Sequence, residues 1–226
     1  IRLRVKGLAR EGQPFFYMVT GIYTNWRRKA NLEEILLKAK RQSYPIDLWV
    51  VDNASGTKYG LRGDDYLLLK HGNELKCWQR WVYAMESETK YTYVMDDDLI
   101  FGHSDIIKNA VEYMEDNPDI DCIGHTGVIY DKAKGYFGSR HVTGVDVDVD
   151  IVKGRFMFFR TSSLEGIDKK PDLTCDDIKI SGHFKKKRIL SILADFDYLK
   201  EGKEALFKQS GQKVKREKSA NKYINL

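Results

Sequence analysis

The first part of the chain alternates strand-like and helix-like apolar patterns. Residues 15–23 and 47–51 are short, mostly apolar runs, and each predicts a buried strand. Between them, residues 31–40 carry apolar side chains at helical spacing. A strand, a helix and a second strand in this order predict a parallel pair of strands joined by a right-handed crossover.

The remaining pattern predicts further strands and helices. Strands are predicted at residues 66–69, 91–95, 122–128 and 156–159, and helices at 75–85 and 104–115. Over residues 142–152, Val and Asp alternate with the period of two that is typical of a half-exposed strand. Strands alternate with helices in the first half and then follow one another. This order predicts an α/β fold with an open mixed sheet of the nucleotide-binding type, flanked by helices.

Composition is that of a folded domain. The chain has 226 residues, of which 42% are hydrophobic, 31% charged and 12% aromatic, and this excludes disorder along its whole length. No apolar run approaches the roughly 18 residues of a transmembrane helix, and we identify no signal peptide. The three cysteines (Cys77, Cys122 and Cys175) are too widely spaced for a zinc site or a disulfide framework. We therefore expect a reducing, cytoplasmic location.

Positive charge is concentrated at the C-terminal end. The net charge is +5, but from His183 onward 12 Lys and Arg face 5 Asp and Glu, so this end carries +7 and the rest −2. The pattern predicts an anionic partner, namely nucleic acid, a phosphate-rich ligand or a membrane surface, although a solvated surface helix has the same composition. Residues 213–222 are of low complexity, and we expect them to be mobile without a ligand.

Three consecutive carboxylates, Asp96, Asp97 and Asp98, follow the predicted strand 91–95. Crowded like charges raise one another's pKa and need a compensating cation. The carboxyl ends of parallel strands are also where open α/β sheets bind ligands. We expect Asp96 and Asp98 to point to the same side and to suit Mg²⁺ or Mn²⁺ carrying a diphosphate. The alternative interpretation is a solvated acidic turn.

Two further acidic positions favour a ligand site. Asp52 ends the strand 47–51 at the same predicted edge, where the base or ribose of a nucleotide would lie, although Asp is also common in turns. Asp176 and Asp177 offer a second carboxylate site, as general-base activation of an acceptor hydroxyl requires. Acidic residues also favour helix N-termini, which is the structural alternative for this pair.

The order of these motifs resembles the GT-A fold glycosyltransferases, especially the inverting family-2-like enzymes. The resemblance covers about residues 15–184. Its motifs are a first strand that ends at Thr20, a second strand that ends at Asp52, the acidic segment Asp96–Asp98, a glycine loop at Gly154, and the pair Asp176-Asp177. The family usually has Glu-Asp where this chain has Asp-Asp. We expect a GT-A catalytic domain over residues 1–184 and a basic, helical C-terminal extension over residues 185–226.

The resemblance implies a role for each matching residue. Thr20 and Asp52 would hold the uracil and ribose, Asp96 would contact the ribose or the metal, and Asp98 would ligate Mn²⁺ or Mg²⁺. Nucleotide-sugar binding would also involve Arg80, Asp97 and Gly154.

The catalytic base would be Asp177, with Asp176 as the alternative, and His183 would be a third metal ligand. A single displacement, in which Asp177 takes the proton of the acceptor hydroxyl, would invert the anomeric centre of a sugar carried by UDP.

For the acceptor, the sequence favours 5-hydroxymethylpyrimidine in DNA over a glycan. Small GT-A-like enzymes of phage type glucosylate such bases, and in that case the location would be the host cytoplasm. The basic residues at 185–188 and 213–222 would follow phosphates, with Tyr223 available to stack. In the glycan alternative, apolar residues at 189–193 would form an amphipathic helix on a membrane surface.

Two interpretations outside this enzyme class remain. One is a module that binds a nucleotide-sugar or nucleic acid without catalysis, but such a module has no need of both Asp98 and Asp177. The other is a nucleotidyltransferase, which usually shows a Gly-rich loop with Lys or Arg after its first strand. The segment at residues 21–25 is not such a loop.

Overall fold

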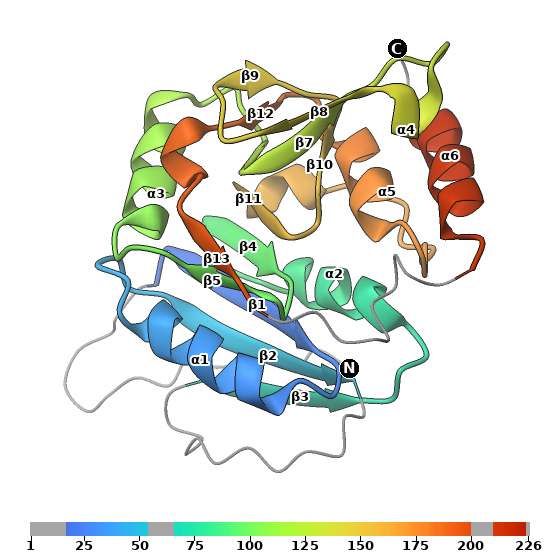
Figure 1. Ribbon diagram of the computed structural model, residues 1–226. Coiled ribbons are helices and arrows are strands. Elements are labelled where there is room, and N and C mark those ends of the chain that lie inside the picture. The colour runs from blue at the N-terminus through green and yellow to red at the C-terminus, as the bar shows by residue number, and fades with distance from the viewer. Residues whose placement is uncertain (1–16, 54–65, 200–209, 225–226) are drawn as a thin grey trace, which may run out of the picture.

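An eight-stranded mixed sheet forms the centre of the computed structural model, which describes residues 17–53, 66–199 and 210–224 (Figure 1). Its strand order is β3-β2-β1-β4-β11-β6-β12-β9. The strands are β1 (Val19–Asn25), β2 (Asp47–Asn53), β3 (Leu67–His71), β4 (Tyr91–Met95), β6 (Cys122–Gly124), β9 (Val147–Asp148), β11 (Phe156–Arg160) and β12 (Lys187–Ile189). The first four strands in that order are parallel, and β11 runs antiparallel to both of its neighbours.

Two smaller sheets extend the second half of the molecule. One has the order β10-β7-β8, with β7 (Thr126–Ile129), β8 (Arg140–Thr143) and β10 (Ile151–Val152). The other pairs β5 (Leu99–Phe101) with β13 (Phe196–Tyr198), directly after the Asp96–Asp98 segment.

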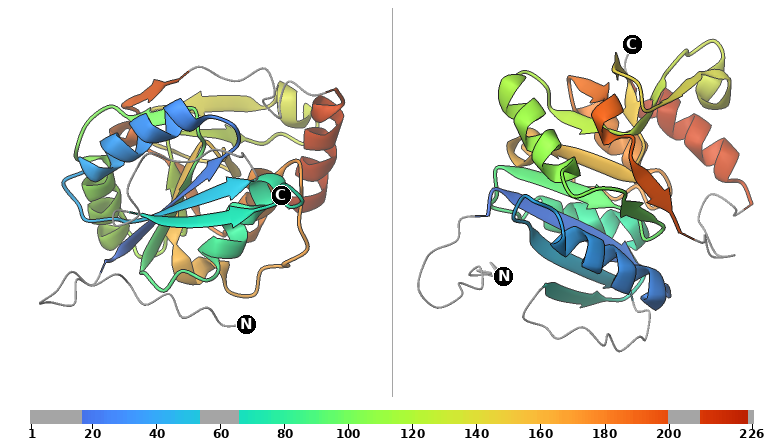
Figure 2. Two further views of the ribbon diagram at one scale, coloured as in Figure 1. Left: turned by 90° about the horizontal axis from the view of Figure 1, so that it is seen from below. Right: turned by 60° about the vertical axis from the view of Figure 1, so that its left-hand side comes forward.

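Helices cover both faces of the main sheet. Helices α1 (Lys29–Lys40) and α3 (Ile106–Asp116) share one hydrophobic cluster with β1, β2, β4 and β11, while α2 (Gln79–Ala84) and α5 (Asp176–His183) pack into a second cluster on the other face. Successive side chains of a strand point to opposite faces, so Tyr93 enters the first cluster and Val94 the second. Figure 2 shows α1 lying against β1–β3 from two further directions.

A third hydrophobic cluster holds the C-terminal helix in place. Helix α6 (Gln212–Tyr223) lies beside α5 and α4 (Gly135–Gly138) (Figure 1). It contributes Ala220, followed by Ile224, to a cluster that includes Tyr136 and Ile178. The prediction that residues 213–222 are mobile without a ligand is therefore wrong, because this segment is a helix with a buried apolar contact.

The α/β fold class and the early strand–helix–strand unit are confirmed. Strand β4 has the predicted bounds. The first strand was predicted at residues 15–23; residues 15 and 16 lie outside the described part, and β1 continues to Asn25 because Thr24 and Asn25 still pair with β2.

Several later elements differ from their predictions. The Val/Asp stretch 142–152 forms three short strands, because the chain turns at Gly144, where φ is +60°, and again between β9 and β10. The run 122–128 divides between two sheets as β6 and β7. Residues 75–85 form a 3₁₀ turn (Lys76–Trp78) followed by the short helix α2.

The main sheet continues beyond the expected domain boundary at residue 184. Strand β12 pairs with both β6 and β9, so the segment after Phe184 supplies an inner strand of the sheet. The expected amphipathic helix at 189–193 is also wrong, because Ile189 ends β12 and residues 191–193 form a 3₁₀ turn. Within the described residues, none of the helices has the length and apolar character needed to cross a bilayer.

Candidate functional site

The carboxyl ends of β1, β2 and β4 meet at one edge of the sheet, as the sequence predicts for Asp52 and Asp96. Tyr23 pairs with Met95, and Asn25 pairs with Asp52, so these strand ends are level. The amide Nδ2 of Asn25 donates a hydrogen bond to Asp52 Oδ1 at 3.3 Å. This edge of the sheet therefore brings together polar side chains at the ends of three strands.

Arg80, at the start of α2, connects the two predicted carboxylate groups. Its side chain is 3% exposed. Nε and Nη2 donate to Asp176 Oδ2 at 3.0 and 2.7 Å, and Nη1 donates to Asp96 Oδ1 at 2.7 Å and to the Gly154 carbonyl at 3.1 Å. The Trp81 indole donates to the same Asp176 oxygen at 2.7 Å. Burial lowers the pKa of Arg80, but the two carboxylates outweigh this effect and raise it above its ordinary value.

The loop that carries Gly154 lies between the two acidic groups. The Arg155 carbonyl accepts a hydrogen bond from the Asp96 N–H at 3.0 Å, and the Gly154 N–H donates to Asp177 Oδ2 at 3.4 Å. A Cβ at position 154 would lie 2.6 Å from Arg80 Nη2 and 3.1 Å from the Asp177 Cβ. Glycine is needed here for close approach of the backbone, so the predicted glycine loop positions the site.

Asp97 and Asp98 face a different arginine. The chain turns after β4, so strand alternation no longer holds, and Asp96 points to Arg80 while the next two carboxylates face Arg28. Arg28 Nη1 lies 2.6 Å from Asp97 Oδ1 and 3.5 Å from Asp98 Oδ2. The Trp26 N–H also donates to Asp97. Asp96 and Asp98 therefore face different arginines and do not share one side as predicted. They are nevertheless close enough for the charge of Asp98 to raise the pKa of Asp96.

Asp96 and Asp97 retain protons more readily than exposed aspartates do. Burial is the main cause and raises the pKa of Asp96 to about 6, against the opposing effect of Arg80. Burial likewise raises the pKa of Asp97 to about 7, against that of Arg28. A cation bound here would favour the ionised form of both groups.

Two oxygens of this turn fit a divalent cation. Asp98 Oδ1 is buried and, within the described part of the chain, accepts no hydrogen bond. Asp96 is about one-third exposed (35%), and its Oδ2 has no hydrogen-bond partner among the same residues. Mg²⁺ and similar ions are often held by one or two carboxylates, with substrate phosphates and water completing the shell. The donor set therefore fits a metal that arrives with a diphosphate.

His183 does not join these carboxylates. It is the last residue of α5, about 10 Å along the helix from Asp176, and its ring contacts Phe184. In the ranges that the structure describes, no group of three or more His, Cys, Asp or Glu side chains is placed to hold a metal. The prediction of His183 as a third ligand is thus not supported, because α5 directs its first turn, not its last, towards the site.

Asp176 and Asp177 lie in the first turn of α5 but have different surroundings. Asp176 Oδ2 accepts three hydrogen bonds from Arg80 and Trp81, so this carboxylate fixes the positions of those two side chains. Asp177 Oδ2 instead accepts a hydrogen bond from Arg216 of α6 at 2.8 Å. Burial raises the pKa of Asp177, but Arg216 outweighs it and holds the pKa below the usual value.

Thr20 is at the other end of β1 from the site. It pairs with Asp47 and Thr92, where β2 and β4 begin, and its hydroxyl bonds with those of Ser87 and Thr89. Asn25 is five positions further along the strand, a distance of about 17 Å. The predicted uracil contact is wrong because β1 runs on to Asn25, which places Thr24 and Asn25 at the edge instead.

Sequence analysis missed Arg28, Asn25 and Trp81, and it assigned Arg216 to phosphate contacts without placing it at Asp177. The first two follow from a correct end for β1, since the residues after a parallel strand lie at the ligand edge. Arg216 carried no local signal, because it stands among other basic residues of α6 and only tertiary packing brings it to Asp177.

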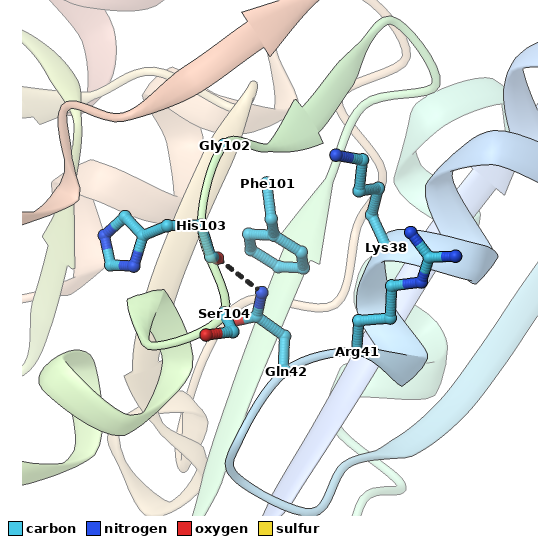
Figure 3. Close-up of a pocket in the computed structure, with 7 residues that line it drawn as sticks. All are labelled: Lys38, Arg41, Gln42, Phe101, Gly102, His103 and Ser104. Atoms are coloured by element: carbon cyan, nitrogen blue, oxygen red, sulfur yellow. Dashed lines mark hydrogen bonds between the residues drawn. The ribbon is translucent and has the colours of Figure 1, made fainter.

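The small hollow in Figure 3 lies elsewhere. Its volume is about 140 Å³, and it is lined by residues 38, 41, 42 and 101–104, with Gln42 donating to the His103 carbonyl. It lies at the opposite end of α1 from Arg28 and contains none of the predicted site residues. The carboxylate groups around Arg80 are therefore the candidate site.

Known structures share this fold. The mannosyltransferase PcManGT from Pyrobaculum calidifontis, in complex with GDP-Man and Mn²⁺, matches with a TM-score of 0.55 and 16% identity over 77% of this chain and 56% of that one. Residues 1–349 of S. aureus TarS, in complex with UDP-GlcNAc, match with a TM-score of 0.64 and 16% identity over 85% of this chain and 61% of that one.

Glucosyl-3-phosphoglycerate synthase from Mycobacterium tuberculosis, in complex with Mn²⁺, UDP and glucosyl-3-phosphoglycerate, matches with a TM-score of 0.65 and 8% identity over 92% of this chain and 80% of that one. No protein-family model and no curated protein sequence matches the chain. The chain spans less than two-thirds of the length of the first two structures. The likeness confirms the expected fold, that of the GT-A glycosyltransferases.

Arg80→Met should lower the free energy of unfolding by about 3–5 kcal/mol, because it leaves buried carboxylates without their counter-charge. Urea denaturation measures this change. Arg140→Met is the matched control, since Arg140 is exposed and should change the stability by no more than about 0.5 kcal/mol. Equal stability of the two variants would contradict the central role of Arg80.

Proposed function

We propose that this chain is a metal-dependent glycosyltransferase that moves a sugar from a nucleoside diphosphate donor to an acceptor hydroxyl. The observation that carries the proposal is the pair of carboxylate groups, Asp96–Asp98 and Asp176-Asp177, held on either side of buried Arg80 at the ligand edge of the sheet. The three fold neighbours described above were each determined with a nucleotide or nucleotide-sugar, and two of them with Mn²⁺, which supports the same class of donor.

The donor side of the site would be formed by the β1, β2 and β4 ends. Asp52 and Asn25 would contact the nucleoside, while Asp96 and Asp98 would hold Mn²⁺ or Mg²⁺. When bound, the metal would offset the negative charge of the diphosphate leaving group. Arg28, next to Asp98, would add a positive charge near the same phosphates.

The acceptor side would be formed by the Gly154 loop and α5. Asp177 would accept the proton of the attacking hydroxyl, and attack from the face opposite the diphosphate would invert the anomeric centre. Asp176 would orient Arg80 instead of taking the proton, because its Oδ2 already accepts three hydrogen bonds.

We retain UDP as the expected nucleotide and 5-hydroxymethylpyrimidine in DNA as the first acceptor to test, with a glycan as the alternative. The structure divides the basic C-terminal end between two places. Lys187 pairs with Cys122 at the edge where β4 begins, whereas Arg216 reaches Asp177 at the opposite edge. Any DNA contact at the site would therefore involve α6 more than residues 185–188.

We also keep the cytoplasmic location as a prediction, which three free cysteines favour.

Release of UDP from UDP-glucose with Mn²⁺ tests the reaction and the acceptor together. We expect release with DNA that contains hydroxymethylcytosine and little with unmodified DNA. Equal slow release with both would support donor turnover and direct the search to glycans. No release from UDP- or GDP-sugars with DNA or glycan acceptors would contradict the proposed function.

Asp98→Asn should weaken Mn²⁺-dependent binding of UDP by about tenfold or more, because it removes one of two carboxylate ligands. Calorimetric titration of UDP with and without Mn²⁺ measures the change. Asp116→Asn removes an exposed carboxylate from the end of α3 and should bind as the unaltered protein does. Undiminished binding by the Asp98 variant would remove that residue from the metal site.

Asp177→Asn should leave UDP binding intact and reduce the rate of sugar transfer by about 10²–10⁴-fold, the usual contribution of a general base. Single-turnover kinetics with saturating donor separate this effect from binding. Transfer at the original rate would exclude Asp177 as the base.

A further inference from the structure

The surroundings of Asp177 contain more positive charge than this carboxylate can neutralise. Arg216 approaches it from α6, and Lys153 precedes Gly154, whose N–H donates to the same carboxylate. Lys153 therefore stands in the loop that reaches the oxygen held by Arg216, and burial together with Arg216 and Arg155 lowers the pKa of Lys153 against the opposing effect of Asp177. Half-buried cations in such proximity favour the binding of an anion.

Arg216 is fixed in position but not saturated. Its Nη2 donates both to Asp177 and to the Tyr136 hydroxyl at 2.8 Å, and its guanidinium lies 4.7 Å from the centre of the Tyr136 ring. Among the described residues, its Nε and Nη1 have no hydrogen-bond partner. Arginine can therefore keep its contact with Asp177 and present further donors to a planar or tetrahedral anion.

Lys153 supplies a second cation near the same carboxylate. Its backbone N–H donates to the Thr126 carbonyl at 2.9 Å, which fixes the loop. Its side chain is half-buried, and its Nζ makes no ion pair or hydrogen bond with the described part of the chain. Burial and the two arginines lower the pKa of Lys153 more than the nearby Asp177 carboxylate raises it, so the charged lysine is costly and binding of an anion would offset that cost.

These cations are separate from those on the donor side. Arg28 lies at Asp97 and Asp98, whereas Arg216 lies at Asp177, and Arg80 lies between the two groups with its own donors directed to Asp96 and Asp176. A hydroxyl that Asp177 deprotonates must be within hydrogen-bond reach of it. An anionic group near that hydroxyl would then lie beside Arg216 and Lys153.

We propose that Lys153 and Arg216 form a phosphate subsite on the acceptor side, so that the acceptor carries a phosphate group close to its reacting hydroxyl. This inference rests on the proposed function, because it takes Asp177 as the residue that meets the acceptor. Arg216 links the phosphate to Asp177 and thereby fixes the distance between the phosphate and the base. The phosphate belongs either to a small phosphorylated acceptor or to a phosphodiester backbone such as that of DNA.

The test uses the full chain with saturating UDP and diamagnetic Mg²⁺, so that the donor phosphate positions are filled and the NMR signals near the metal stay visible. Inorganic phosphate is then titrated and followed by ¹⁵N–¹H NMR. We expect saturable shifts at Lys153–Arg155 and around Arg216, and at least about tenfold weaker binding in Lys153→Gln and Arg216→Gln. Arg216→Lys should lose less, because it retains the charge.

Lys215→Gln and Lys218→Gln are matched controls, since both lysines are exposed on the same helix and carry the same charge. They should bind phosphate as the unaltered protein does. All variants should retain their UDP affinity, which also shows that they fold. Phosphate binding that is unchanged in Lys153→Gln and Arg216→Gln, or equally weakened in the controls, would overturn the subsite.

Competition identifies the source of the phosphate. Displacement of inorganic phosphate by glycerol 3-phosphate supports a small phosphorylated acceptor, and displacement by a short DNA duplex supports a phosphodiester acceptor. Displacement by neither would overturn the acceptor assignment. Failure of UDP to bind with Mg²⁺ or Mn²⁺ would instead contradict the proposed function itself, so the two failures are distinguishable.

Discussion

The buried guanidinium of Arg80 is the constraint on which the candidate site depends. It joins the turn after β4 to the first turn of α5, two segments that are 80 residues apart in the chain, and it also binds the loop before β11. Burying one arginine with two aspartates is costly unless each charge is paired and hydrogen-bonded. The geometry meets that condition with four hydrogen bonds from Arg80 and one from Trp81. The stability of this part of the fold and the placement of its carboxylates therefore have the same cause.

The change of strand direction beside β4 provides the second half of the site. On one side of β4, parallel strands bring Asp52 and Asn25 to the edge where Asp96 lies. On the other side, β11 is antiparallel, so its first residue, Phe156, pairs with Met95 and the loop before it reaches the same edge. Gly154 in that loop then approaches Arg80 and Asp177 closely. If β11 were parallel to β4, the loop after it would lie at this edge instead of the Gly154 loop before it.

Sequence patterns predicted the parts of the site that depend on local order. Asp52 and Asp96 were placed correctly because strand ends and parallel pairing follow from periodicity. Thr20 was misplaced because the polar residues Thr24 and Asn25 obscured the true end of β1, although they still pair with β2. The stretch 142–152 is not one continuous strand, since Gly144 allows a positive φ that breaks it, and Val145 is exposed despite the alternating pattern. Arg216 could not be found in this way, because its contact with Asp177 depends on how α6 packs.

The concentration of basic residues at the C-terminal end suggested one anionic partner, but the fold places these residues in different parts of the molecule. Lys186 and Arg188 form ion pairs with Asp119 and Asp148, far from the carboxylate edge, and exposed pairs of this kind contribute little energy. Arg216, in contrast, is only 16% exposed and is held by Tyr136 and Asp177. Lys153, which lies outside the basic end of the sequence, stands on the same side of the site. Burial and unsatisfied donors distinguish the residues of the proposed phosphate subsite from the other basic residues, and the net charge of a segment does not reveal this difference.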